Sequence, residues 1–128
     1  MATRELTSHR VNGLNEHLTI AVKDGPGPGN ANHEYEIVYI KRSPAGVQTP
    51  VSVPISFQNG PINEVGVTGL SNEALLAIVE DRLVGFQGGQ YACRENALAL
   101  THLQESLMWL QKRTRDRMAR GVEGTSTV

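Results

Sequence analysis

The chain has 128 residues, of which 39% are hydrophobic, and a formal net charge of −1. This length suits one domain, and two Phe, three Tyr and one Trp predict a modest core that oligomerisation would help to complete. No apolar run could span a bilayer, no secretory leader opens the chain, and a single cysteine excludes a disulfide within it. We therefore expect a cytoplasmic protein, and the near-neutral charge balance argues against a nucleic-acid binder.

The first half of the chain predicts a small antiparallel β-sheet with long loops, over about residues 12–68. Residues 1–11 are polar and predict no regular element, whereas the apolar run 18–22 is typical of a strand. The Gly25–Gly29 loop follows, in which glycines favour tight turning or a lid. It lacks the Gly-Lys-Ser/Thr ending of a phosphate-binding P-loop.

Three further segments complete the predicted sheet. The two-residue period of segment 34–42 predicts a partly exposed strand that ends at its basic residues. Pro50 and Pro54 cannot donate to a ladder, so segment 47–57 is expected at a sheet edge. Residues 62–67 are expected to add a last strand.

The second half changes to a helical period and predicts an antiparallel two-helix hairpin over about residues 69–121, with 122–128 as a tail. Ser71 or Asn72 is the candidate N-cap of the first helix, with Glu73 in its first turn. The fold class is thus α+β in a single domain, residues 1–128. Apolar residues at helical spacing predict the stripes of the two helices: Leu75, Val79, Leu83 and Phe86, then Ala97, Leu100, Leu103, Leu107 and Leu110.

The second helix, expected over residues 92–120, ends in a cluster of positive charge. Five of the twelve Lys and Arg residues lie in positions 112–120. Arg113, Arg117 and Arg120 recur at i, i+4 and i+7, so their guanidiniums can share one face and bind phosphate oxygens. The helix macrodipole alone favours basic residues here by about 0.3–1 kcal/mol each. Five in one short stretch exceed that need and predict an anion site.

An aromatic ring and an amide flank the hairpin turn. Arg113 follows Asn96 by seventeen residues, or roughly 26 Å along one helix, so one chain cannot close both around a small ligand. If two hairpins pack antiparallel, the turn of one meets the basic end of the other. Phe86 would then stack on a base, Asn96 would bond its edge, and Arg113 with Arg117 would hold phosphates. Alternatively, Phe86 merely ends the apolar stripe.

The roles of two other side chains can each be interpreted in two ways. Cys93, beside Arg94 at the helix start, is either a stabilised thiolate or a small buried residue. Trp109, with Met108, either packs in the core or serves a second contact surface.

Several blocks of the hairpin carry a resemblance to known phage proteins. The blocks are Asn72–Val79, Phe86-Gln87, Ala92–Ala97, Met108–Leu110, Lys112–Thr114 and Arg120–Gly124. They resemble, over roughly residues 62–124, the helical hairpin shared by phage anti-CBASS and Thoeris anti-defence sponge proteins. Arg10–Asn15 and the loop that runs to Tyr35 resemble the sheet added by the first Thoeris anti-defence family, which is therefore the better match.

The resemblance implies a protein that sequesters immune second messengers without degrading them and so prevents effector activation. In that family, glycocyclic ADP-ribose isomers and cyclic dinucleotides occupy pockets between protomers of a dimer-based hexamer, and cyclic trinucleotides occupy separate sites. Carried over by position, Phe86 and Asn96 match the base-contacting pair, and Arg113 and Arg117 match the phosphate-contacting pair. Arg94 matches an arginine of the trinucleotide site.

One expected basic contact, in the loop before Pro61, has no counterpart, because residues 58–60 are neutral. The ranking of the ligands therefore stays open.

The residues themselves assemble no catalytic machinery, cofactor site or metal site. The four histidines show no metal-ligand spacing: His9, His17, His33 and His102. Asn32, His33 and Glu34 are the acid/base candidates if the glycine-rich loop closes over a ligand. We expect a non-enzymatic protein that acts inside the infected bacterial cell, without nucleic acid or membrane as partner. The alternatives are a cyclic nucleotide-degrading enzyme and a nucleic-acid-binding hairpin.

Overall fold

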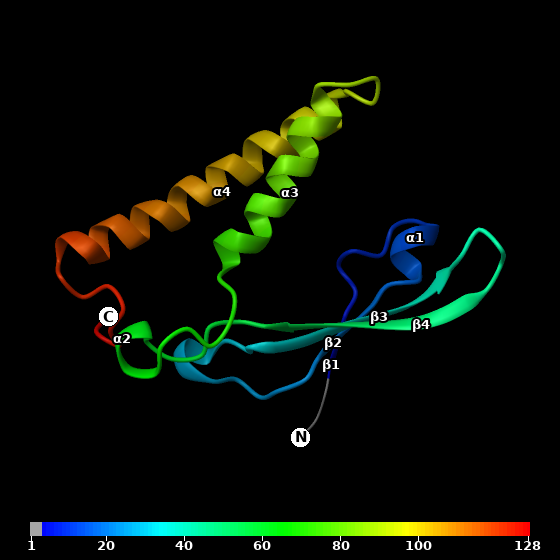
Figure 1. The fold of residues 1–128 in the computed structure, drawn as a ribbon. Helices are drawn as coiled ribbons and strands as arrows, with labels where there is room; N and C mark the ends of the chain where they lie inside the picture. The colour runs from blue at the N-terminus through cyan, green and yellow to red at the C-terminus, as the bar shows by residue number, and fades with distance from the viewer. Residues whose placement is uncertain (1–3) are drawn as a thin grey trace. The chain divides into compact units, whose positions relative to one another are not determined.

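A computed structural model describes residues 4–128, and its contacts divide the chain into two compact units, one ending at Asn59 and the other beginning at Gly60. The first unit is a sheet and the second a set of helices, so the α+β class with a C-terminal hairpin is confirmed (Figure 1). The expectation of a single domain stays a prediction.

The first unit is a four-stranded antiparallel sheet in which each strand pairs with the next one along the chain. Its elements are β1 (Arg4–Leu6), α1 (Gly13–Glu16), β2 (Thr19–Val22), the 3₁₀ turn η1 (Pro28–Asn30), β3 (Glu34–Arg42) and β4 (Gln48–Ser56). The sequence did not predict β1, which pairs with β2 from Arg4 opposite Val22 to Leu6 opposite Ile20. A strand of three residues is too short to show an alternation of apolar and polar residues. It forms because β2 provides backbone hydrogen-bonding partners for it. Residues 1–3 lie outside the described range.

The predicted edge position of β4 is confirmed, since β3 is its only partner among the described strands. The Phe57 N–H donates to the His33 carbonyl over 2.8 Å, which extends the ladder and makes the odd-numbered residues of β4 the hydrogen-bonded ones. Pro50 and Pro54 fall on the other set, opposite Ile40 and Glu36. Their nitrogens therefore point to the open edge, where a missing N–H costs nothing and discourages a further strand.

The second unit contains α2 (Ile62–Val65), α3 (Asn72–Gln87) and α4 (Arg94–Ala119). The expectation of a strand over 62–67 is wrong. The carbonyl of Pro61 accepts from the N–H groups of Glu64 and Val65, both at 3.0 Å, and closes one helical turn. Gly66, with φ of 73°, ends that turn.

The hairpin begins and turns with capped helix ends. The Ser71 hydroxyl accepts from the Ala74 N–H at 3.1 Å, which confirms Ser71 as the N-cap of α3. Cys93 caps α4, because its Sγ accepts from the Asn96 N–H at 3.4 Å, while the Gln87 side-chain oxygen accepts from the Cys93 N–H at 3.1 Å. Cys93 is exposed, so the interpretation as a buried residue is wrong. α4 starts two residues later than predicted, at Arg94.

The two long helices pack side by side (Figure 1), yet they cover each other only in part. Leu107 is buried, whereas Ala97 and Val79 of the predicted stripes are exposed, and so is Phe86. Two helices can bury only one narrow stripe of each other, and the wider apolar surface stays uncovered. Large apolar residues with at least half of their surface exposed in this hairpin are Ile78, Val84, Tyr91, Met108, Trp109 and Met118. Among the described helices, none has the length and apolar character needed to cross a membrane.

Candidate functional site

The C-terminal end of α4 forms a positively charged pocket of about 360 Å³, a volume within the range of small-molecule sites. It is lined by Trp109, Lys112, Arg113, Asp116, Arg117, Arg120 and Val128, and we call it the arginine pocket. Five of these residues recur at helical spacing on one face of α4, and Arg120, the C-cap of that helix, continues the same face. Four cations face one carboxylate, and that carboxylate is engaged, because Lys112 Nζ lies 2.6 Å from Asp116 Oδ2. The pocket therefore keeps an excess of positive charge.

Arg113 is the cation of this pocket that is open to a ligand. Its side chain is exposed and makes no hydrogen bond or ion pair with any residue in the described range 4–128. Trp109 precedes it by one helical turn and is 58% exposed, so an indole face and a guanidinium lie next to each other on the pocket wall. A stacking surface beside a planar cation suits a nucleotide base and its phosphate.

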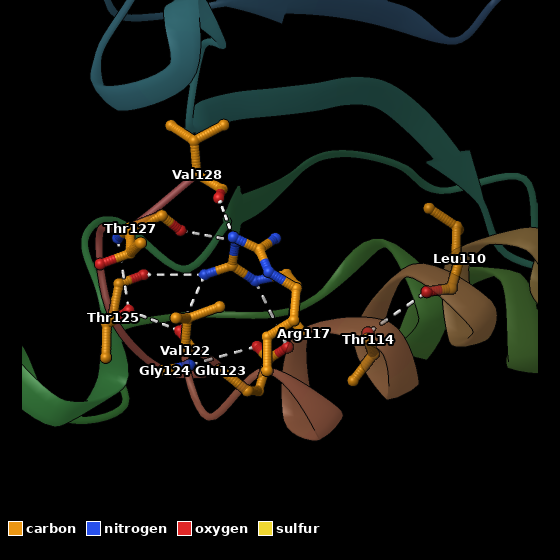
Figure 2. Close-up of polar contacts among 10 residues, drawn as sticks. Leu110, Thr114, Arg117, Val122, Glu123, Gly124, Thr125, Thr127 and Val128 are labelled. Atoms are coloured by element: carbon orange, nitrogen blue, oxygen red, sulfur yellow. Dashed lines mark hydrogen bonds and ion pairs between the residues drawn. The ribbon is translucent and has the colours of Figure 1, made fainter.

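Arg117 has a different environment, although it lies only one turn from Arg113. It is buried, with 9% of its surface exposed. Its Nη1 donates to the Thr127 carbonyl at 2.7 Å, and its Nη2 donates to the carbonyls of Val122 at 2.9 Å and Thr125 at 3.1 Å (Figure 2). Glu123 Oε2 lies 3.6 Å from its Nε. The guanidinium thus borders the pocket while most of its donors are used within the chain.

The sequence after α4 explains why the chain returns to Arg117. Gly121, with φ of 73°, takes the left-handed conformation that ends a helix. Its N–H donates to the Met118 carbonyl and the Val122 N–H to the Arg117 carbonyl, both at 3.0 Å, which is a Schellman cap. A glycine at position 121, directly after the basic end of the helix, is the signal in the sequence that predicts this turn.

At the hairpin turn, Phe86 is 38% exposed and lies in a small aromatic and cationic cluster. The Arg82 guanidinium lies over its ring at 5.5 Å, and the Tyr91 ring meets it edge to face at 6.5 Å. Arg82 and Phe86 are four residues apart on one helix, so their contact could have been inferred from spacing. A planar ligand that stacks on the Phe86 ring would therefore also lie near the Arg82 guanidinium and the Tyr91 phenol.

Asn96 and Arg94 lie in the first turn of α4. The Asn96 backbone N–H is used by the Cys93 cap, and its side chain is partly exposed. Arg94 is exposed and makes no hydrogen bond or ion pair within the described residues. One chain thus places Phe86, Asn96 and Arg94 near the turn, and Arg113 with Arg117 at the far end of a 26-residue helix.

The acid/base candidates of the first unit are held in structural contacts. The Asp24 carboxylate accepts from the N–H groups of His33, at 3.0 Å, and Glu34, at 3.2 Å. The Glu34 carboxylate accepts from the Ser56 hydroxyl at 2.6 Å, and the His33 ring is buried against Gly27. Adjacent residues of an extended chain point to opposite faces, so the side chains of His33 and Glu34 point away from each other.

Backbone donors also set the acidity of Asp24. Desolvation by itself raises the pKa of this carboxyl, but the hydrogen bonds from His33, Glu34 and Asn32 together outweigh it. The pKa of Asp24 therefore lies below its ordinary value of 3.8. Asn32 also links the loop to β1, because its side-chain oxygen accepts from Arg4 at 2.8 Å and its Nδ2 donates to the Asp24 carbonyl at 2.7 Å.

Two comparisons with known proteins relate this chain to phage anti-defence proteins. The protein named Thoeris anti-defense 1 of Bacillus phage SBSphiJ7 is 55% identical over 71 residues, which is 56% of this chain and 50% of that protein. The chain thus spans about half the length of this curated relative. The family model described as Acb2/Tad1, hairpin domain matches residues 49–115, a range that includes Phe86, Arg94, Asn96 and Arg113 but ends before Arg117. Because this match covers more than half of the chain, the protein belongs to the Acb2/Tad1 hairpin domain family.

Proposed function

We propose that this chain is a phage anti-defence protein that binds cyclic nucleotide second messengers of the bacterial host and holds them without degrading them. The ligands are glycocyclic ADP-ribose and, in the same pocket, cyclic dinucleotides, with cyclic trinucleotides at a second site. The relationship to Thoeris anti-defense 1 supports the biological setting, the infected bacterial cell. The arginine pocket carries the chemical part of the proposal.

The pocket suits a phosphorylated ligand for electrostatic reasons. Arg113 is unpaired within the described residues, and Arg117 and Arg120 border the same cavity. A guanidinium remains charged at all physiological pH values and presents paired donors to phosphate oxygens. Arg113 is therefore the principal phosphate contact in this proposal, and Arg117 contributes the edge of its guanidinium that borders the pocket.

The base-contacting residues reach this ligand from a second protomer. Asn96 and Arg113 lie roughly 26 Å apart along one helix, further than a cyclic dinucleotide-sized ligand bridges with both ends buried. In an antiparallel pair of hairpins, Phe86 and Asn96 of one protomer lie beside Arg113 of its partner. The uncovered apolar side chains of the hairpin, such as Ile78 and Met108, support burial against another copy. We propose a dimer-based oligomer, hexameric as the family resemblance implies.

Arg94 is assigned to the separate trinucleotide site. It is exposed at the start of α4, far along the helix from the arginine pocket. Loss of Arg94 should therefore weaken trinucleotide binding and leave the smaller ligands unaffected.

Sequestration requires stacking and charge-assisted hydrogen bonds, but no general base, nucleophile or metal. The contacts of His33 and Glu34 give no support to the alternative of a cyclic nucleotide-degrading enzyme. The net charge of −1 gives none to the nucleic-acid binder, which would need a broad basic surface. Absence of catalysis is part of the proposal and is tested directly.

The deciding experiment is a capture and release assay. The purified protein is mixed separately with glycocyclic ADP-ribose, a cyclic dinucleotide and a cyclic trinucleotide, free ligand is removed, and the protein is heat-denatured before chromatography of what it releases. Intact ligand supports sequestration, altered ligand makes the protein an enzyme, and no ligand refutes the proposal.

Variants locate the site in the same assay. Arg113→Ala should lose about 10- to 100-fold in affinity for glycocyclic ADP-ribose, the loss of a charge-assisted contact. Arg115→Ala is the matched control, because Arg115 is an exposed arginine of the same helical turn that does not line the pocket. Equal losses in both variants would indicate general charge attraction instead of a site.

A further inference from the structure

The segment that follows α4 is held against its own helix by one buried arginine. We call residues 121–128 the C-terminal segment. Arg117 donates to three of its carbonyls, those of Val122, Thr125 and Thr127, spread over six residues (Figure 2). Within the segment, the Thr125 hydroxyl also donates to the Val122 carbonyl, and the Thr127 N–H donates to the Thr125 hydroxyl at 3.3 Å. The result is a compact turn around a guanidinium.

Two further contacts fix where this turn lies. The Asn63 N–H donates to the Gly124 carbonyl at 3.0 Å, which docks the segment on α2. At the other end, Arg120 Nη2 donates to the backbone oxygen of Val128 at 2.7 Å, and both residues line the arginine pocket. The segment therefore reaches the pocket through Val128, and we call this contact the wall; the backbone of the segment is held at both ends.

Arginine is the residue type that this arrangement requires. A buried cation must recover its hydration from other polar groups, and here backbone carbonyls supply that with a carboxylate at 3.6 Å. A guanidinium has five donors in a fixed plane and can reach several acceptors in different directions, whereas an ammonium is a single point. Lysine would keep the charge and lose this geometry.

We propose that Arg117 is a positioning residue: it holds the C-terminal segment so that Val128 stays at the arginine pocket as its wall, and this wall determines which nucleotides fit there. The identity of the ligand rests on the proposed function, but the clamp itself does not. A residue that only contacts phosphate would act through its own charge, whereas Arg117 also acts through the segment whose carbonyls it binds.

Two variants release the segment by independent routes. Arg117→Lys keeps the positive charge and removes the fork. Gly124→Ala keeps every arginine, but a Cβ at Gly124 would lie 2.8 Å from Ile62 Cγ2, and φ is 79° there, so the contact between the segment and α2 must shift. Gly46→Ala is the control, because φ is 83° at Gly46 and a Cβ would meet nothing within 4 Å. It reproduces the backbone strain at a turn of the other unit.

Hydrogen–deuterium exchange and ligand binding are then measured on the same samples. In the proposal, the amides of Val122 and Thr125 exchange faster in Arg117→Lys and in Gly124→Ala, and both variants lose about tenfold or more in affinity for glycocyclic ADP-ribose, the size of one charge-assisted contact. Gly46→Ala keeps both properties. Arg113→Ala loses affinity and keeps the protected segment, which separates a phosphate contact from a positioning residue.

Contrary results are equally specific. If Arg117→Lys keeps the segment protected, Arg117 is not the clamp. If Gly124→Ala frees the segment and binds like the wild type, the wall does not take part in binding. If the wild type holds no nucleotide, the proposed function fails, and the clamp is decided by exchange alone: lost protection in both variants supports it, and retained protection refutes it.

Discussion

Each unit of this protein has an irregular segment in which one charged side chain binds several backbone groups, and the two charges have opposite signs. In the sheet unit, the Asp24 carboxylate gathers the N–H groups of His33 and Glu34 at the end of a glycine-rich loop. In the helical unit, the Arg117 guanidinium gathers carbonyls of the C-terminal segment. The loop before β3 presents backbone N–H groups, and a carboxylate accepts from them. The segment after α4 presents backbone carbonyls, and a guanidinium donates to them.

The two charged side chains differ in their response to acid and in their burial. Asp24 is a carboxylate, which acid neutralises, whereas a guanidinium is not a group that acid neutralises. Arg117 is also buried, so its loss leaves several carbonyls without a donor in a poorly solvated place. The two anchors should therefore respond differently to substitution and to acid.

The largest effect is expected from removal of the buried anchor. Arg117→Met keeps much of the side-chain volume and removes all donors, and we expect a loss of about 2–3 kcal/mol in the unfolding free energy of the helical unit. Trp109 is the single tryptophan and lies in this unit, so denaturation followed by its fluorescence reports the loss selectively. A change below about 0.5 kcal/mol, the level of an ordinary surface substitution, would contradict the role of Arg117 as an anchor.

The second largest effect is expected from overpacking at Gly27, and it tests whether side-chain packing, in addition to Asp24, stabilises the glycine-rich loop. A Cβ at Gly27 would lie 3.1 Å from the buried His33 ring, so Gly27→Ala should cost about 1–3 kcal/mol by overpacking. Gly29→Ala is the comparison, because φ is 76° there and nothing lies within 4 Å, so it should cost about 1 kcal/mol in backbone strain alone. Nuclear magnetic resonance of the His33 ring should change in the first variant only. Unchanged ring resonances in both would show that the loop yields without disturbing His33.

The third effect is the acid response of the sheet unit. Because the pKa of Asp24 is lower in the folded state than its ordinary 3.8, its carboxylate stabilises the fold above that pH. This contribution is lost as the pH falls through the lower folded value. The Asp24→Asn variant should lack this acid-dependent part, as measured by exchange of the His33 amide at several pH values after correction for the intrinsic rate.

The smallest effect sets the scale for an exposed charge. Lys112 and Asp116 form an i, i+4 ion pair in which about 60% of each side chain is exposed. Lys112→Ala should change the unfolding free energy by only about 0.3–0.5 kcal/mol. A loss as large as that of Arg117→Met would mean that surface charge, not the buried clamp, stabilises this helix end.

Helix propensity and spacing were enough to predict much of the second unit. The hairpin, its Ser71 cap and the common face of Arg113, Arg117 and Arg120 all follow from local geometry, since a helix repeats every 3.6 residues whatever surrounds it. The edge position of β4 was equally readable, because proline cannot donate anywhere. The predicted ligand roles of Phe86 and Arg94 stay predictions.

Other features depend on partners that are distant in sequence, and local patterns could not predict them. The strand β1 exists because β2 offers it a ladder, and residues 62–65 form a turn of helix where their apolar character suggested a strand. Val79 and Phe86 belong to an apolar stripe in sequence but remain exposed, because one partner helix cannot cover so wide a surface.

The sequence by itself determined that three arginines lie on one face of α4, since that is a matter of helical period. Only the tertiary structure decided that Arg113 faces the open pocket while Arg117 is turned into the protein. The two residues are chemically identical and one turn apart, so nothing local distinguishes them. The distinction arises because Gly121 turns the chain back and brings the carbonyls of Val122, Thr125 and Thr127 within reach of one guanidinium and not of the other.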